Sequence, residues 1–230
     1  MKTIGLLGGM SWESSQVYYR ELNQRINQAL GGLHSAQMVM INVDFAPIEQ
    51  LMLAGDWVAV SNILIKHCLQ LQGAGADFIV IATNTMHKLA PAIEAAIQVP
   101  LLHIADAVGQ SKVIKPLKTV GLLGTAFTME AEFYTTRLNT KYGLDTLIPD
   151  DGQRLMVNQI IFDELCKGQF NTSSKQQYLK VINDMAQQGA QAIVLACTEI
   201  GLLVQQDDTD VTLIDATEEH IKMAVHQALL

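Results

Sequence analysis

Short apolar runs alternate with longer stretches of helical periodicity along this chain. The runs are rich in Ile, Val and Leu and occupy residues 3–9, 75–83, 99–102, 119–125, 189–197 and 211–214. Such runs are typical of parallel strands that are buried on both faces. Apolar residues at helical spacing fill the segments between them, over 11–30, 49–74, 86–97, 129–142, 153–167, 173–188 and 216–229. Strands that alternate with helices predict an α/β fold with parallel sheets.

Local signals mark both ends of the first predicted helix. Ser11 is a good N-cap, Glu13 lies in the first turn, and Gly31-Gly32 follows the last turn. After this helix, Met38 and Met40 flank Val39 in a further predicted strand, where we expect both methionines in the core.

The chain repeats itself. Residues 3–9 return as 119–125 at an offset of 116, 75–83 return as 189–197 at 114, and 99–102 return as 211–214 at 112. Three matches in the same order predict two similar lobes related by a pseudo-twofold axis. We expect the first lobe to span 1–114 and the second 115–215, with the helix over 216–230 free to pack back on the first. Since ligands bind beyond the carboxyl ends of parallel strands, we expect an active-site cleft between the lobes.

Composition limits the classes of function. The 230 residues are 49% apolar and carry a formal net charge of −8, which disfavours electrostatic binding of nucleic acid. No apolar run approaches the ~18 residues of a membrane helix. The N-terminus is predicted to be a strand rather than a signal peptide, so we expect a cytoplasmic protein with no membrane or nucleic-acid partner.

The cysteines and histidines favour neither a disulfide framework nor a metal site. Cys68, Cys166 and Cys197 are scattered and form no CxxC pair. We interpret the first two as structural. Four of the six histidines, His34, His103, His220 and His226, have no metal-like spacing with one another.

The repeat aligns the residues that follow equivalent strands. Thr83 corresponds to Cys197, Asn84 to Thr198, and Thr85 to Glu199. A thiol between a strand end and a helix is a candidate reactive group, because a helix N-terminus stabilises a thiolate and lowers the thiol pKa. The alternative is a small buried cysteine with a packing role. His87, about one turn after Thr83, is a candidate supporting residue at the cleft or a packing residue.

Asp106 and Asp215 follow the third pair of matched strands. Each is a candidate N-cap or supporting group. The glycines after the first strand form neither GxGxxG nor a P-loop, so a dinucleotide site is not predicted. A backbone nest there would suit a carboxylate as well as a phosphate.

Four motifs together resemble the aspartate/glutamate racemase family over essentially the whole chain. They are Gly-Leu-Leu-Gly-Gly-Met at 5–10, Thr-Asn-Thr-Met-His at 83–87, Gly-Leu-Leu-Gly-Thr at 121–125 and Cys-Thr-Glu at 197–199. The resemblance implies a homodimeric enzyme that needs no cofactor or metal and acts on a small amino acid. It implies catalytic roles for Thr83 and Cys197 and substrate contacts at Met10, Asn84, Thr85, Thr125, Thr198 and Glu199.

The chain departs from the family pattern in two respects. Members typically carry one cysteine in each lobe, whereas Thr83 replaces the first, as in a subgroup described as specific for L-aspartate and L-glutamate or as broad amino-acid racemases. The segment after Asp44 carries no Arg, and Lys167 is the nearest cation in the later helix. The side-chain specificity of the substrate site is therefore open.

We expect racemisation by removal and return of the α-proton, with Cys197 abstracting from the L-enantiomer as the resemblance implies. Related enzymes of the same superfamily remain alternatives: a hydantoin racemase, a maleate isomerase or a malonate decarboxylase. A non-catalytic small-molecule-binding protein is the alternative from another class. The retained Cys-Thr-Glu at 197–199 favours an enzyme.

Overall fold

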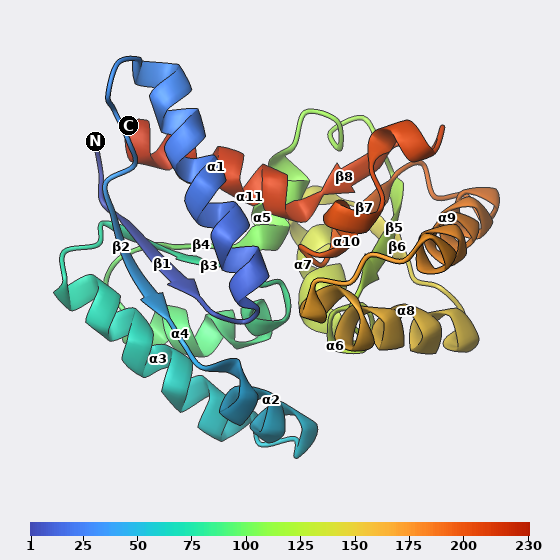
Figure 1. The fold of residues 1–230 in the computed structure, drawn as a ribbon, viewed down its shortest axis with the longest axis horizontal. Coiled ribbons are helices and arrows are strands. Elements are labelled where there is room, and N and C mark those ends of the chain that lie inside the picture. The colour runs from blue at the N-terminus through green and yellow to red at the C-terminus, as the bar shows by residue number, and fades with distance from the viewer. The chain divides into compact units, whose positions relative to one another are not determined.

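The computed structural model describes residues 1–230, which form two compact units (Figure 1). The first unit comprises Met1–His103 and His220–Leu230, and the second comprises Ile104–Glu219. Each contains one parallel four-stranded sheet with helices around it, which confirms the predicted α/β class. The chain leaves the first unit at residue 103 rather than at the expected 114, because the helix after the fourth strand packs within the second unit.

The elements follow one another with short connections. The first unit contains β1 (Ile4–Gly8), α1 (Trp12–Leu30), β2 (Met38–Asn42), α2 (Phe45–Leu53), α3 (Trp57–Gly73), β3 (Phe78–Ile81), the 3₁₀ helix η1 (Thr85–Leu89), α4 (Ala90–Ala96) and β4 (Leu101–Leu102). The second contains α5 (Ile104–Gln110), β5 (Thr119–Gly124), α6 (Ala126–Glu130), α7 (Glu132–Tyr142), β6 (Asp145–Leu147), α8 (Asp151–Asp163), η2 (Leu165–Lys167), α9 (Thr172–Gln187), β7 (Ile193–Ala196), α10 (Ile200–Leu203), η3 (Gln206–Asp208) and β8 (Leu213–Asp215). The last helix, α11 (Ala216–Leu229), runs from the second unit into the first.

The two sheets have the same strand order and the same register. The orders are β2-β1-β3-β4 and β6-β5-β7-β8. Gly5 pairs with Ile79 in the first sheet, and Gly121 pairs with Ile193 in the second. Since these residues correspond at offsets 116 and 114, the internal repeat of the sequence is a repeat of the structure.

Helices cover both faces of the first sheet. On one face, α1 and α11 pack in one buried cluster with β1 and β3; its members include Tyr18, Leu22, Ile26, Ile221, Ala224, Ala228, Ile4, Leu6, Phe78 and Val80. The α3 helix contacts the same two strands and β2 and buries Val60, Leu64, Cys68 and Leu71. Each large apolar side chain buried in this way contributes about 1.5–3 kcal/mol. Burial on both faces explains why β1 and β3 are continuously apolar.

In the second unit, successive side chains along β5 and β7 point alternately into two hydrophobic clusters. Val120, Leu122, Val194 and Ala196 face α5 and α7. Leu123, Ile193 and Leu195 face α8 and α9, together with Cys197. This period of two places the side chain of Cys197 on the α8–α9 side of the sheet.

Several predicted elements differ from the observed ones. The helix expected over 49–74 is two helices, because Gly55 has φ of 74° and Asp56 caps α3 by accepting from the Ala59 N–H at 2.9 Å. The stretch over 129–142 is α7 preceded by the separate short α6, while α5 was not predicted. The helix expected after Cys197 is present as α10, but it has only four residues. Met40 is 37% exposed rather than in the core, because β2 is an edge strand.

Helix ends follow the expected chemistry. Ser11 caps α1 by accepting from the Ser14 N–H, and Gly31 ends it at φ of 77°. No helix of the chain is long and apolar enough to span a bilayer.

Candidate active site

The turn after β3 carries the first group of predicted site residues. Thr83 is half-buried, and Asn84 and Thr85 are buried where the chain enters η1. The Thr83 N–H donates to the carbonyl of Ile81 at 2.9 Å, which turns the chain out of the strand. Met10 is buried in the loop after the neighbouring strand β1. The first unit thus gathers these four residues at the carboxyl ends of adjacent strands.

The side chain of Asn84 is buried without a hydrogen-bond partner. It is 4% exposed, and neither Oδ1 nor Nδ2 is bonded. A buried polar group left unpaired costs about 1–3 kcal/mol. An amide whose NH2 donors and carbonyl acceptor are both unused is suited to bind a polar ligand.

His87 contacts the same turn. Its Nδ1 lies 2.9 Å from the carbonyl oxygen of Thr83, and its backbone N–H donates to the carbonyl of Asn84 at 3.1 Å. The ring is buried and bonds the Thr83 carbonyl, so of the two predicted roles His87 has that of a residue supporting this turn.

The loop after β1 is fixed by Gly9. Its φ is 96°, and a side chain there would collide with the backbone of Val43, so only glycine fits. The Gly9 N–H donates to Ser15 Oγ at 2.7 Å, and Ser15 Oγ donates to the carbonyl of Ser11 at 2.9 Å. The Gly9 N–H of the backbone nest expected here is therefore already bonded within the protein and is not available to a ligand.

The turn after β7 pairs a thiol with a carboxylate. Cys197 is 8% exposed, and its Sγ–H donates to Glu199 Oε2 at 3.0 Å. Burial, followed by the charge of Glu199, raises the pKa of the Cys197 thiol well above its ordinary value. The prediction of a lowered thiol pKa is wrong, because α10 is a single turn whose dipole does not offset desolvation and a neighbouring carboxylate. The resting side chain is therefore a thiol with a proton acceptor in place.

The residues around this turn are closely packed. Thr198 is buried, and Ile200 donates its N–H to the carbonyl of Cys197 at 3.1 Å. Gly201 lies against Asp215, whose Oδ2 would be 2.5 Å from a Cβ at that glycine. Asp215 also caps α11 by accepting from the Thr217 N–H at 2.7 Å, as one of its two predicted roles required.

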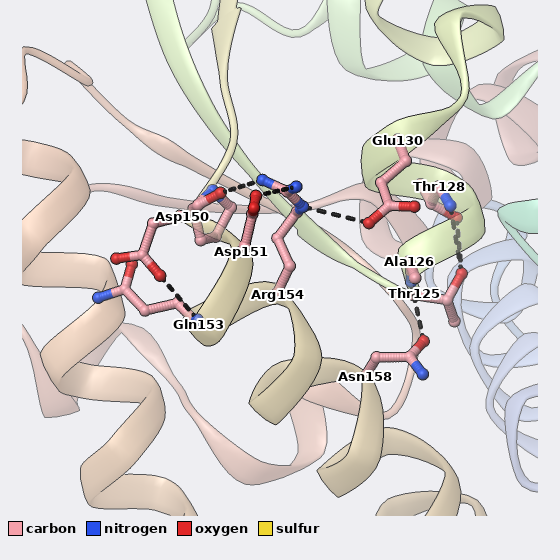
Figure 2. Close-up of polar contacts among 10 residues, drawn as sticks. Thr125, Ala126, Thr128, Glu130, Asp150, Asp151, Gln153, Arg154 and Asn158 are labelled. Carbon is pink, nitrogen blue, oxygen red and sulfur yellow. Dashed lines mark hydrogen bonds and ion pairs between the residues drawn. The ribbon is translucent and has the colours of Figure 1, made fainter.

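Thr125 caps the short α6 after β5. Its Oγ1 accepts from the Thr128 N–H at 3.3 Å and lies 3.2 Å from Thr128 Oγ1 (Figure 2). The neighbouring Ala126 N–H donates to Asn158 Oδ1 on α8 at 2.8 Å. Asn158 holds this turn from 32 residues away, and no sequence signal pointed to it.

Several cations of the second unit pair with carboxylates of the same unit. Arg154 bonds Glu130, Asp151 and the carbonyl of Pro149 (Figure 2). Lys167 is exposed at 3.7 Å from Asp163. Asp106, the other aspartate singled out above, pairs with both Arg137 and Lys141 rather than capping a helix. No group of three or more His, Cys, Asp or Glu side chains is arranged to hold a metal ion.

Each unit therefore presents one polar turn after its third strand, at equivalent positions of the repeat. Thr83 belongs to the first unit and Cys197 to the second. That the two turns serve one substrate stays a prediction.

A family profile and several solved structures match this chain over most or all of its length. The family profile described as Asp/Glu/Hydantoin racemase matches residues 7–224. The chain belongs to this family. Among solved structures, this family member is similar to a candidate Asp/Glu racemase from Yersinia pestis, at 47% identity and a TM-score of 0.93 over 100% of both chains. It is also similar to an aspartate racemase homologue from Pyrococcus horikoshii OT3, at 29% identity and a TM-score of 0.85, again over 100% of both chains.

A curated relative of this racemase-family chain is the broad specificity amino-acid racemase RacX of Bacillus subtilis. The two are 27% identical over 154 residues, which is 67% of this chain and 66% of the relative. The match therefore spans just under two thirds of that racemase.

Proposed function

We propose that this chain is an amino-acid racemase that works without a cofactor, with aspartate, glutamate or a related polar amino acid as substrate. The observation that carries the proposal is the Cys197 thiol, buried and bonded to Glu199 at 3.0 Å at the end of a central strand. Membership in the racemase family and the relative named a broad specificity amino-acid racemase support the same reaction.

In this mechanism Cys197 takes the α-proton from one face of the substrate. The thiol first transfers its own proton to the carboxylate of Glu199, which lies within hydrogen-bond distance. The resulting thiolate then removes the α-proton, and the electron pair of the C–H bond moves toward the substrate carboxylate. A buried site favours this step, because oriented donors are worth more away from water.

Thr83 returns a proton to the opposite face. Its hydroxyl is too weakly acidic to be ionised as a base, so it donates or relays a proton from water. The substrate's developing negative charge needs hydrogen-bond donors, and the unpaired amide of Asn84 is the first candidate. Thr85, Thr125 and Thr198 are further candidates as buried hydroxyls beside the two turns.

The difference between thiol and hydroxyl predicts asymmetric isotope exchange. The two enantiomers have equal free energy in water, so kcat/KM is the same in both directions. A thiolate can, however, return a solvent deuteron to the face from which it took the proton. We propose that Cys197 serves the L-enantiomer, so that L-substrate exchanges its α-proton with retention faster than it is inverted, while D-substrate does not.

The test incubates the protein with L- and D-forms of aspartate, glutamate and homoserine in D₂O. Proton NMR follows loss of the α-proton, and chiral chromatography follows inversion. We expect both with at least one substrate, and neither with Cys197→Ser. Thr83→Cys is expected to raise exchange from the D-enantiomer. Absence of exchange with every amino acid tested would overturn the proposal, and equal retention from both enantiomers would overturn the assignment of faces.

A further inference from the structure

Three buried histidines meet in the first unit. His87, His103 and His220 are 1%, 3% and 0% exposed. The ring centroid of His87 lies 4.7 Å from that of His103 and 5.5 Å from that of His220. His87 comes from η1, His103 follows β4, and His220 lies on α11, so the cluster joins segments that are far apart in the sequence.

The hydrogen bonds of this cluster fix where its protons lie. A carbonyl oxygen only accepts, so His87 Nδ1 carries the hydrogen donated to Thr83, and His220 Nε2 carries the one donated to the carbonyl of Leu102 at 2.9 Å. Nδ1 of a neutral His220 then accepts from the Tyr18 hydroxyl at 2.8 Å. Burial, followed by the nearby His87, lowers the pKa of His220 to about 3, so this ring is neutral at pH 7.

These bonds argue against a metal site in the cluster. Both ring nitrogens of His220 are already used, one by Tyr18 and one by Leu102. A histidine ligand needs a free nitrogen lone pair directed at the ion. The rings are instead packed against each other at tilted and edge-on angles of 55° and 72°.

The cluster also occupies both points at which the chain passes between the units. His103 is the last residue of the first segment of this unit, and His220 is the first residue of its second segment. His87 packs against both rings. Its position is thus set by the sheet, through β4, and by the C-terminal helix.

His87 in turn holds the backbone of the candidate site residues. Its ring bonds the carbonyl of Thr83, and its N–H bonds the carbonyl of Asn84. Two consecutive peptide groups, which carry the candidate proton donor and the candidate substrate amide, therefore depend on one side chain and its backbone.

We propose that His87 is a positioning residue, which places the Thr83 hydroxyl for reaction by bonding the Thr83 carbonyl through its ring from within the histidine cluster. The bond to the Asn84 carbonyl comes from the His87 backbone N–H, so side-chain variants keep it. This proposal rests on the racemase function proposed above. A displacement of about 1 Å at a reacting group can cost up to ~100-fold in rate. The effect should fall on the step that Thr83 serves, which is inversion, rather than on exchange with retention at Cys197.

The experiment compares His87→Asn with His87→Leu. Asn and Leu side chains have the same branched shape. The Asn amide can present an N–H near the position of His87 Nδ1, whereas Leu has no donor. Inversion and exchange with retention are measured together from saturating L-substrate in D₂O, with circular dichroism as the check on folding. For Leu we expect inversion to fall about 10- to 100-fold while retention changes less than about threefold. Asn is expected to restore most of the inversion.

A third variant covers the case in which Leu does not fold. His87→Gln keeps polarity but moves the N–H one bond further along the side chain, and it should lose inversion as Leu does. If Asn, Gln and Leu invert equally well, or if inversion and retention fall together in each, His87 has only a structural role and the proposal is overturned. A wild-type protein without any exchange would overturn the racemase function and this proposal together, whereas an active wild type with unaffected variants overturns this proposal alone.

Discussion

The Sγ–H of Cys197 donates to Oε2 of Glu199 at 3.0 Å, so the reactive thiol of the second unit rests in its protonated form beside a proton acceptor. Burial and the Glu199 charge both raise the thiol pKa. The cysteine of this pair is therefore not a thiolate at rest. The pair offers a short path along which the thiol proton can leave when substrate arrives.

Replacing Glu199 by Gln tests this path. The amide keeps the size of the side chain but cannot take the proton, so kcat for α-proton exchange should fall about 10²- to 10⁴-fold. Loss of the negative charge should at the same time lower the pKa of Cys197 and make the thiol easier to alkylate at pH 8. Glu94→Gln, which removes an exposed carboxylate, is the control and should change neither quantity. A Glu199→Gln variant with normal kcat would exclude the carboxylate as the acceptor.

Replacing Asn84 by Ala should separate binding from stability. The variant removes two unpaired buried polar atoms, so the free energy of unfolding should stay level or rise by roughly 1 kcal/mol. The KM for the amino acid should rise about tenfold, because the substrate loses a hydrogen-bonding partner. Urea unfolding and steady-state kinetics measure the two effects.

Asn139→Ala is the matched control, since Asn139 is exposed and bonds Asp145. It should leave KM unchanged. A clear loss of stability in Asn84→Ala with an unaltered KM would identify Asn84 as a structural residue.

A methyl group at Gly201 should disturb the turn that carries Cys197. Its Cβ would lie 2.5 Å from Asp215 Oδ2, so either α10 or the N-cap of α11 must shift. We expect Gly201→Ala to lower the free energy of unfolding by about 1–3 kcal/mol and to reduce kcat. Gly152→Ala, in α8, has its nearest contact at 3.5 Å and should instead stabilise by about 0.5–1 kcal/mol. Thermal unfolding of the two variants tests the pair, and equal melting temperatures would contradict it.

Asp215 should make stability depend on pH. Burial raises the pKa of its carboxyl from 3.8 to about 6, so between these values the folded state keeps a proton that the unfolded state has lost. The stabilising contribution of this group is complete below pH 3.8 and is lost as the pH rises through about 6.

Asp215→Asn removes that pH dependence while keeping an oxygen that can accept from the Thr217 and Glu218 N–H groups. The free energy of unfolding of the variant minus that of wild type should grow by on the order of 1–3 kcal/mol from pH 4 to pH 7. Denaturant titrations at the two values measure the difference. A constant difference would show that Asp215 titrates alike in the folded and unfolded chains.

The order of residues along the chain was enough to predict the fold class and the repeat. Apolar runs at constant offsets predicted two parallel sheets, and the register of Gly5 with Ile79 and of Gly121 with Ile193 repeats as those offsets require. The same offsets aligned Thr83 with Cys197 after equivalent strands. Periodicity carries this information because strands buried on both faces must be apolar throughout.

Contacts between distant segments decided the chemistry. Sequence spacing predicted a lowered pKa for Cys197, whereas burial and Glu199 raise it. The bond from Asn158 to Ala126 and the meeting of His87, His103 and His220 have no local signal. Local pattern selects helices and strands, but desolvation and hydrogen bonding depend on which surfaces those elements bring together, and only the tertiary structure fixes that.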